Sequence, residues 1–195
     1  MKRLDQRAFN VLFNDARTHM EWQAGPVTDG DLREIYHLAK WGPTAANANP
    51  ARFVFIRSPQ AKERLKPHLA EGNVTKTMSA PCTVIMAWDT EFYEKLRKVF
   101  PSRDLRSVYA GKPTLIEETA FRNATLQAAY LMLAARALGF DCGPMSGFNR
   151  EGVDKEFLSD QRWRSNFLCN IGHGVEGKLF PRNPRFDFDE ACLDL

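Results

Sequence analysis

The 195-residue sequence has no stretch of about 18 apolar residues, which is the length that a membrane-spanning helix requires. Its first residues are basic, but no apolar segment follows them, so an export signal is not expected. Charge of one sign is also scarce, because 27 Lys and Arg against 24 Asp and Glu leave a net charge of only +3. That charge is too small for a polyanion-binding surface. We therefore expect a cytoplasmic protein that binds neither membranes nor nucleic acid.

Cysteine is sparse and is placed without a pattern. The four cysteines form no CxxC pair and have no histidine at zinc-ligand spacing, which argues against a metal site and a disulfide scaffold. Free cysteine is among the most buried residue types. We interpret the four as small buried side chains in a reducing compartment: Cys82, Cys142, Cys169 and Cys192.

The signatures of several enzyme classes are missing. No GxSxG, HExxH or GxxxxGK[ST] motif occurs, which argues against hydrolase, zinc-protease and P-loop chemistry. Residues 172–177 (Gly-His-Gly-Val-Glu-Gly) do satisfy GxGxxG after an expected strand. A dinucleotide-binding motif needs a helix to open at that point, and Pro181 and Pro184 prevent one. We therefore reject the dinucleotide-binding interpretation.

What is present is the composition and periodicity of a globular domain. Hydrophobic residues make up 44% of the chain, and its length suits one domain over residues 1–195. Apolar residues recur at helical spacing in the segments 7–16, 28–39, 59–69, 91–99, 113–138 and 150–158. Short β-branched and aromatic runs predict strands at 52–57, 82–88, 140–142 and 167–171.

These elements predict an α+β fold with three α/β/α layers. The central sheet should contain about four strands, whose directions the sequence leaves open. The longest helix, 113–138, is apolar nearly all round over residues 128–138. We therefore expect this helix to run through the centre of the molecule or through a subunit interface.

Polar or glycine-rich loops are expected at the ends of the apolar elements, where rigid scaffolds commonly carry sites. Arg17 and Arg185 stand in two of these loops, and two arginines can bind a phosphate through bidentate hydrogen bonds. Each could equally cap a helix or form a surface ion pair. The adjacent acids Glu117 and Glu118 on the long helix indicate a solvated face. The loops are residues 17–19, 43–49, 72–76, 143–147 and 178–185.

Taken in order, these loops resemble the motifs of the nitroreductase family, and the match extends over nearly the whole chain. Residues 15–22 (Asp-Ala-Arg-Thr-His-Met-Glu-Trp) resemble the segment that binds the FMN phosphate. The resemblance implies Arg17 and Thr18 as phosphate contacts and His19 as a further cofactor contact. Ala16 and Met20 stand where the family has basic residues.

Further motifs extend the resemblance along the chain. Residues 43–50 (Pro-Thr-Ala-Ala-Asn-Ala-Asn-Pro) resemble a loop that lies against the flavin ring, with Asn49 in place of glutamine. Residues 143–148 (Gly-Pro-Met-Ser-Gly-Phe) resemble a turn whose backbone N–H groups meet flavin N5, and residues 182–185 resemble a basic segment that closes on the phosphate. The resemblance thus implies these further cofactor contacts: Pro43, Thr44, Ala45, Asn47, Asn73, Lys76, Pro144, Met145, Ser146, Gly147, Arg182 and Arg185.

The resemblance implies an FMN-dependent oxidoreductase that takes hydride from NADH or NADPH and passes it through flavin N5 to a small electrophile, with ping-pong kinetics. It also implies a homodimer with FMN at the subunit interface. Residues 15–19, 118–123 and 143–148 look like the malonic semialdehyde reductases of pyrimidine degradation, and we hypothesise that Arg122 contacts the substrate carboxylate. A broad nitro or quinone reductase, a non-catalytic flavin-binding protein and a cofactor-free interaction module remain alternatives.

Overall fold

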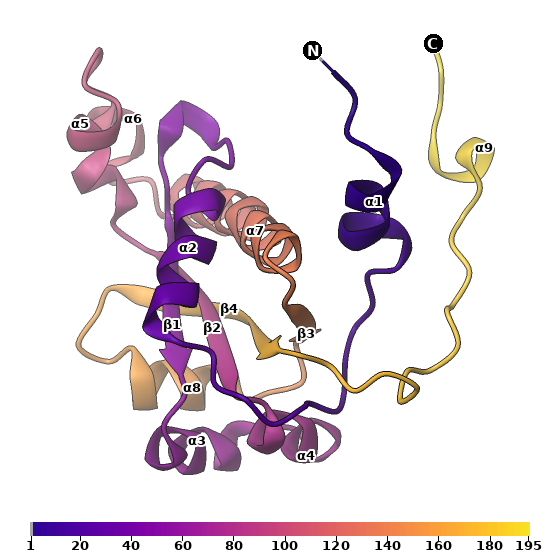
Figure 1. Ribbon diagram of the computed structural model, residues 1–195. Coiled ribbons are helices and arrows are strands. Elements are labelled where there is room, and N and C mark those ends of the chain that lie inside the picture. Colours follow the sequence, from indigo (N-terminus) through magenta and orange to yellow (C-terminus); the bar gives the residue numbers. More distant parts are fainter. Residues whose placement is uncertain (1) are drawn as a thin grey trace.

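The computed structural model describes residues 2–195, in which helices surround a four-stranded sheet (Figure 1). The strands are β1 (Ala51–Ile56), β2 (Cys82–Asp89), β3 (Asp141–Met145) and β4 (Trp163–Gly172). The α-helices are α1 (Gln6–Phe9), α2 (Asp29–Ala39), α3 (Pro59–Leu65), α4 (Glu71–Ser79), α5 (Leu96–Val99), α6 (Arg106–Tyr109), α7 (Pro113–Ala137), α8 (Arg150–Phe157) and α9 (Phe188–Ala191). A π-helical turn, Asn10–Asn14, extends α1, and 3-10 turns lie at Ala45–Asn47, Lys66–His68 and Phe92–Lys95.

The sheet is antiparallel throughout, with the strand order β1-β2-β4-β3. Its second strand, β2, is buried along its whole length, and alternate side chains face opposite layers. Cys82, Val84 and Met86 pack with α2 and α7, whereas Ile85 and Ala87 pack with α3 and α8. The sheet is therefore the middle of three layers, which confirms the predicted α+β fold with α/β/α layering.

The long helix α7 confirms the helix predicted over 113–138. It begins with a proline at its first position, and Gly139 follows it in the left-handed conformation (φ 84°). Leu131 and Ala135 are fully buried against the sheet layer, but Leu126 and Tyr130 are exposed by 47% and 39%. Within a single chain, one face of this apolar helix is therefore buried and the other is exposed.

Residues 72–76, which the sequence predicted to be a loop, lie inside α4. Glycine, asparagine and threonine have low helix propensity, so tertiary contacts must supply the helix stability that the local sequence does not provide. The ammonium group of buried Lys62 donates hydrogen bonds to the carbonyls of Thr77 and Ala80 at the end of α4, and to Thr83 Oγ1 on β2. Burial lowers the pKa of Lys62 to about 8. A cation at the C-terminal end of a helix is favourable, and here it fixes α4 to the sheet.

Other corrections to the sequence prediction are smaller. Cys82, Cys142 and Cys169 are buried free thiols, as expected, but Cys192 is exposed on the C-terminal segment. The third strand extends beyond residue 142 to Met145, and the fourth begins earlier than expected, at Trp163.

Both ends of the chain stand apart from the three layers, on the same side of the molecule (Figure 1). The Arg182 guanidinium joins them by donating hydrogen bonds to the carbonyls of Asn14 and Ala16 (2.6 and 3.1 Å). The C-terminal segment leaves Phe186, at 79% exposure, and several other apolar side chains open to solvent. Among residues 2–195, no helix is both long enough and apolar enough to cross a lipid bilayer.

Candidate functional site

The segment after α1 is fixed along the edge of the sheet. Thr18 forms a parallel bridge with Cys142 on β3, and the His19 N–H donates to the Cys142 carbonyl (3.1 Å). This close approach requires Gly143, because a Cβ atom there would lie 2.7 Å from the His19 carbonyl oxygen. The same approach leaves the His19 side chain buried, with its Nε2 3.2 Å from the carboxylate of Asp141. His19 therefore links the segment after α1 to strand β3.

Helix α4 brings one expected contact, Lys76, to the same segment. The indole N–H of Trp22 and the side-chain amide of Asn170 both donate to the carbonyl of Lys76 (3.0 and 3.1 Å), which fixes that turn of the helix. The Lys76 ammonium lies 3.6 Å from the sulfur of Met20. Burial lowers the pKa of Lys76, and among residues 2–195 no carboxylate pairs with it. Its charge is available to a bound group.

The turn after β3 presents two unused backbone donors. The Asn73 side-chain amide and the Ala70 N–H both donate to the Gly147 carbonyl (2.7 and 3.0 Å), so α4 holds this turn in place. The N–H groups of Ser146 and Gly147 themselves donate to no other part of the chain between residues 2 and 195. Both residues are exposed. Two fixed, solvent-accessible N–H donors suit an acceptor atom on a ligand, as the resemblance implied for flavin N5.

A cavity of about 470 Å³ opens between the two ends of the chain, and we call it the arginine cavity. Arg17 donates to the carbonyl of Phe180, and Arg185 donates to the carbonyls of Asn183 and Pro184 (both 3.0 Å). The residues that line it are Leu12, Phe13, Ala16, Arg17, Thr18, Met20, Arg136, Phe180, Pro181, Arg182, Asn183 and Arg185.

The arginine cavity has the charge of an anion site. Its lining contains four arginines and no acidic residue, and none of the four pairs with a carboxylate anywhere in the described chain. Arg17, Arg182 and Arg185 donate to backbone carbonyls, which leave the positive charge unneutralised. Guanidinium groups match phosphate oxygens in geometry as well as charge. The residues present therefore fit the phosphate end of the expected FMN.

The segment after α1 connects the arginine cavity to α4, which holds the turn after β3. Thr18 and Met20 line the cavity, while Met20 also contacts Lys76 on α4. Most of the expected contacts therefore converge on this side of the chain: Arg17, Thr18, Asn73, Lys76, Pro144, Met145, Ser146, Gly147, Arg182 and Arg185.

The loop between α2 and β1 has a strained backbone. Ala46, Asn47 and Asn49 have φ values of 50°, 48° and 46°, which cost free energy for residues other than glycine. Two buried amides on α7 hold this conformation. Asn123 accepts a hydrogen bond from the loop backbone (2.8 Å), and Gln127 donates to the Asn49 side chain (3.1 Å). Such maintained strain is typical of functional loops.

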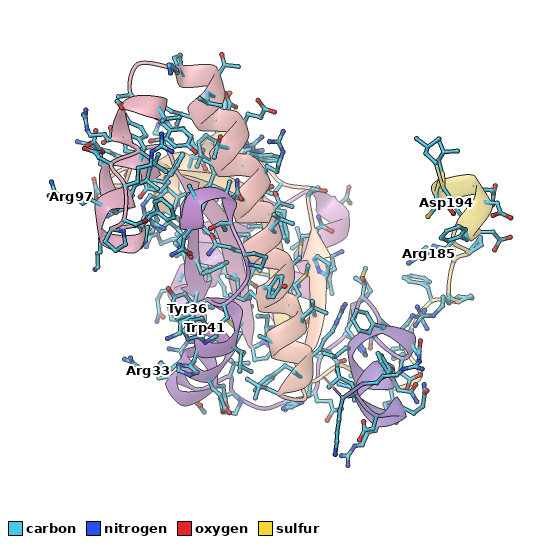
Figure 2. The ribbon with its side chains drawn as sticks, turned by 90° about the horizontal axis from the view of Figure 1, so that it is seen from above. Arg33, Tyr36, Trp41, Arg97, Arg185 and Asp194 are labelled. Atoms are coloured by element: carbon cyan, nitrogen blue, oxygen red, sulfur yellow. The ribbon has the colours of Figure 1, made fainter. Side chains whose placement is uncertain are left out.

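This strained loop does not reach the arginine cavity of its own chain. Figure 2 shows Trp41, just before the loop, on the opposite side of the molecule from Arg185. The Asn47 side chain donates instead to the carbonyl of Val99 (2.7 Å). Within one chain, four expected contacts therefore lie away from the arginine cavity: Pro43, Thr44, Ala45 and Asn47.

Arg122 also lies outside the arginine cavity. It is exposed on α7 and pairs with Glu118 one turn earlier. Glu117 and Glu118 are exposed, which confirms the predicted solvated face.

Sequence reasoning missed Arg136, although it lines the arginine cavity. The available signal was a lone charge within the apolar segment 128–138. The rejection of the GxGxxG motif is confirmed, because residues 178–187 form no helix after it and α9 has only four residues.

Comparisons with known proteins agree with this geometry. The family model described as "Nitroreductase family" matches residues 16–173. A Rhodopseudomonas palustris (strain TIE-1) protein, provisionally named an NADH dehydrogenase/NAD(P)H nitroreductase, is 60% identical over 184 residues, which are 94% of each chain. A Bacillus subtilis structure provisionally named a nitroreductase has a TM-score of 0.88 at 25% identity, covering 98% of this chain and 100% of its own. An Exiguobacterium sibiricum 255-15 structure, provisionally named a nitroreductase and in complex with FMN, has a TM-score of 0.85 at 16% identity, with both chains fully covered.

The contact between α4 and the turn after β3 can be tested with two glycines. A Cβ atom at Gly147 would lie 2.6 Å from Asn73 Nδ2, so Gly147→Ala must displace Asn73 or the turn. We expect a loss of about 1–3 kcal/mol in the free energy of unfolding, measured in urea. Gly72→Ala is the control, because a Cβ atom at Gly72 meets nothing within 4 Å. It should be neutral or stabilise by up to about 1 kcal/mol, and equal destabilisation by both variants would contradict the contact.

Proposed function

The chain belongs to the nitroreductase family, and from this premise we propose that it is an FMN-dependent NAD(P)H oxidoreductase. One observation carries the proposal: the segment after α1 lines an arginine cavity without any carboxylate and contacts α4, and α4 also holds a turn that presents two unused N–H donors. The arginine cavity suits a phosphate, and the two N–H donors of the turn suit a heteroatom of an attached ring system. Held by these residues, FMN would supply the chemistry of hydride exchange between NADH or NADPH and a second substrate.

The roles of the chain's own residues follow from their positions. Arg17, Arg182 and Arg185 neutralise the phosphate and fix one end of the cofactor. The N–H groups of Ser146 and Gly147 hold the reactive side of the ring in one orientation, supported by Asn73 and α4. Because these donors are fixed before the ligand arrives, they need no reorganisation during the reaction.

Lys76 supplies positive charge beside that ring position. Its ammonium contacts only the Met20 sulfur among the hydrogen-bond acceptors of residues 2–195. A partly buried cation without a carboxylate partner stabilises negative charge more strongly than a surface cation does, because less water screens it. We assign Lys76, with Asn73, to stabilising the anionic charge that develops on the reduced ring.

A homodimer completes the site in this proposal. The strained loop lies on the opposite side of the chain from the arginine cavity, so a second copy must deliver Pro43, Thr44, Ala45 and Asn47 to the flavin. Leu126 and Tyr130 leave an apolar stripe on α7 that a second copy can cover. The exposed apolar side chains of the C-terminal segment provide a further surface for contact.

The physiological acceptor is the finer part of the proposal. Malonic semialdehyde is a small aldehyde with a carboxylate, and it would be reduced to 3-hydroxypropionate. We propose Arg122 as its carboxylate contact, delivered at the dimer interface because Arg122 is exposed on α7. A broad nitro or quinone reductase would use the same cofactor without a carboxylate contact. A reducing, cytoplasmic compartment also belongs to this proposal, because three buried cysteines are free thiols.

Cofactor binding is tested with the double variant Arg17→Ala/Arg185→Ala. Loss of two charged contacts to the phosphate should weaken FMN binding by at least about a hundredfold, measured by flavin fluorescence. Wild-type protein with FMN should lose its visible flavin absorbance on anaerobic addition of NADH or NADPH. Binding without bleaching would indicate a non-catalytic flavin carrier. No binding would indicate a cofactor-free module, and unchanged affinity in the double variant would contradict the assigned phosphate site.

The acceptor is tested by steady-state kinetics with malonic semialdehyde and a nitroaromatic compound. If Arg122 binds the carboxylate, Arg122→Ala should raise KM for the semialdehyde by about tenfold or more and leave KM for the uncharged nitroaromatic unchanged. Equal KM values for the semialdehyde in both proteins would remove Arg122 from the substrate site. Efficient turnover of the nitroaromatic alone would favour the broad reductase.

The homodimer is tested by sedimentation, which should show a species of twice the 22.2 kDa chain mass. Leu126→Glu places a charge on the apolar stripe of α7 and should shift the protein towards monomer, with a parallel loss of FMN affinity. Lys155→Glu, exposed on α8, is the matched control. A wild-type monomer that binds FMN fully would contradict the shared site.

A further inference from the structure

We propose that Arg136 is a further phosphate-binding residue and the rigid anchor of the arginine cavity. The inference rests on the proposed FMN binding and deepens it, because the family motifs quoted above do not include this position. Arg136 lies in the last turn of α7, whereas the other three cavity arginines lie outside regular helices and strands. The backbone of Arg136 belongs to a 25-residue helix packed on the sheet, so the point from which its side chain extends is fixed before any ligand arrives.

The Arg136 side chain is incompletely paired in the described chain. Its Nε atom is buried and has no hydrogen-bond acceptor among residues 2–195. An unsatisfied buried N–H costs free energy, and most such groups in folded proteins have a partner. The Nη groups of Arg136 are not buried in this way and donate to no atom among residues 2–195, and the side chain lines the arginine cavity. A phosphate in that cavity would accept hydrogen bonds from the Nη groups and supply the counter-charge.

The positions of the cavity's charges also favour a role for Arg136. A phosphate monoester carries close to two negative charges at neutral pH. The segment that follows α1 contributes only Arg17 to the cavity, and its neighbour Met20 lines the wall as an apolar side chain. Arg182 and Arg185 come from the exposed C-terminal segment. Arg17 and Arg136, both half-buried, therefore form the fixed part of the site, and the C-terminal arginines close over it.

The experiment compares two ligands that differ only in the phosphate. Dissociation constants for FMN and riboflavin are measured by flavin fluorescence with wild-type protein, Arg136→Met and the exposed control Arg97→Ala (Figure 2). Methionine keeps the apolar stem of the side chain and removes its charge and N–H groups. We expect Arg136→Met to weaken FMN binding about tenfold to a hundredfold and to change riboflavin binding by less than about threefold. Arg97→Ala should alter neither constant.

Other outcomes would overturn the inference. If Arg136→Met weakens both ligands equally, Arg136 acts through packing, and if it weakens neither, Arg136 does not bind the phosphate. Should Arg136→Met fail to fold, the polar variant of equal length, Arg136→Gln, is judged by the same ratio of constants. A wild-type protein that binds neither ligand would overturn the proposed function together with this inference. Normal FMN binding with an unchanged ratio in the variant would overturn this inference alone.

Discussion

Mutual repulsion among guanidinium groups is the constraint on which the site depends. Four arginines share one cavity without a carboxylate, and three of them, Arg17, Arg182 and Arg185, donate to backbone carbonyls. Like charges at this density disfavour the folded chain unless an anion joins them. The fold supports the arrangement through the rigid end of α7 and the segment bridged to β3. A phosphorylated ligand therefore contributes stability as well as chemistry, because it binds the folded state selectively.

Around the turn after β3, donors of the chain also bind backbone carbonyls. Asn73 and Ala70 use their donors on the Gly147 carbonyl, which leaves the N–H groups of the turn free. Lys62 holds the far end of α4 against the sheet through backbone carbonyls and Thr83. Buried polar side chains thus transmit the rigidity of the sheet to a surface turn. The consequence is a site whose donors are oriented before a ligand binds.

Much of this architecture could be predicted from residue patterns. The 25-residue α7 and the buried β2 have strong periodic or β-branched signals, and both lie within a residue or two of their expected bounds. Helix α4 could not be found, because its stability comes from Lys62, a residue far away in the sequence, and not from local propensity. Its register nevertheless decides where Asn73 and Lys76 lie.

The expected cofactor contacts lie on two different sides of the chain. The loop residues Pro43 and Asn47 have the backbone strain of a functional loop, yet they lie away from the arginine cavity of their own chain. A linear motif cannot tell whether two segments meet within one chain or between two. Arg136 was hidden for a different reason, because a single charge inside an apolar helical segment gives no periodic signal. The role of Arg136 becomes visible only in the structure, where it lines the arginine cavity together with residues from both ends of the chain.

A crystal structure of the protein with FMN bound is the most direct test of the central claim, that the arginine cavity holds the phosphate of the cofactor. The account predicts phosphate oxygens within hydrogen-bond distance, about 2.7–3.2 Å, of the guanidinium groups of Arg17 and Arg136, with the ring reaching the turn at Ser146 and Gly147. A phosphate bound elsewhere, with the arginine cavity filled only by solvent, would contradict the account.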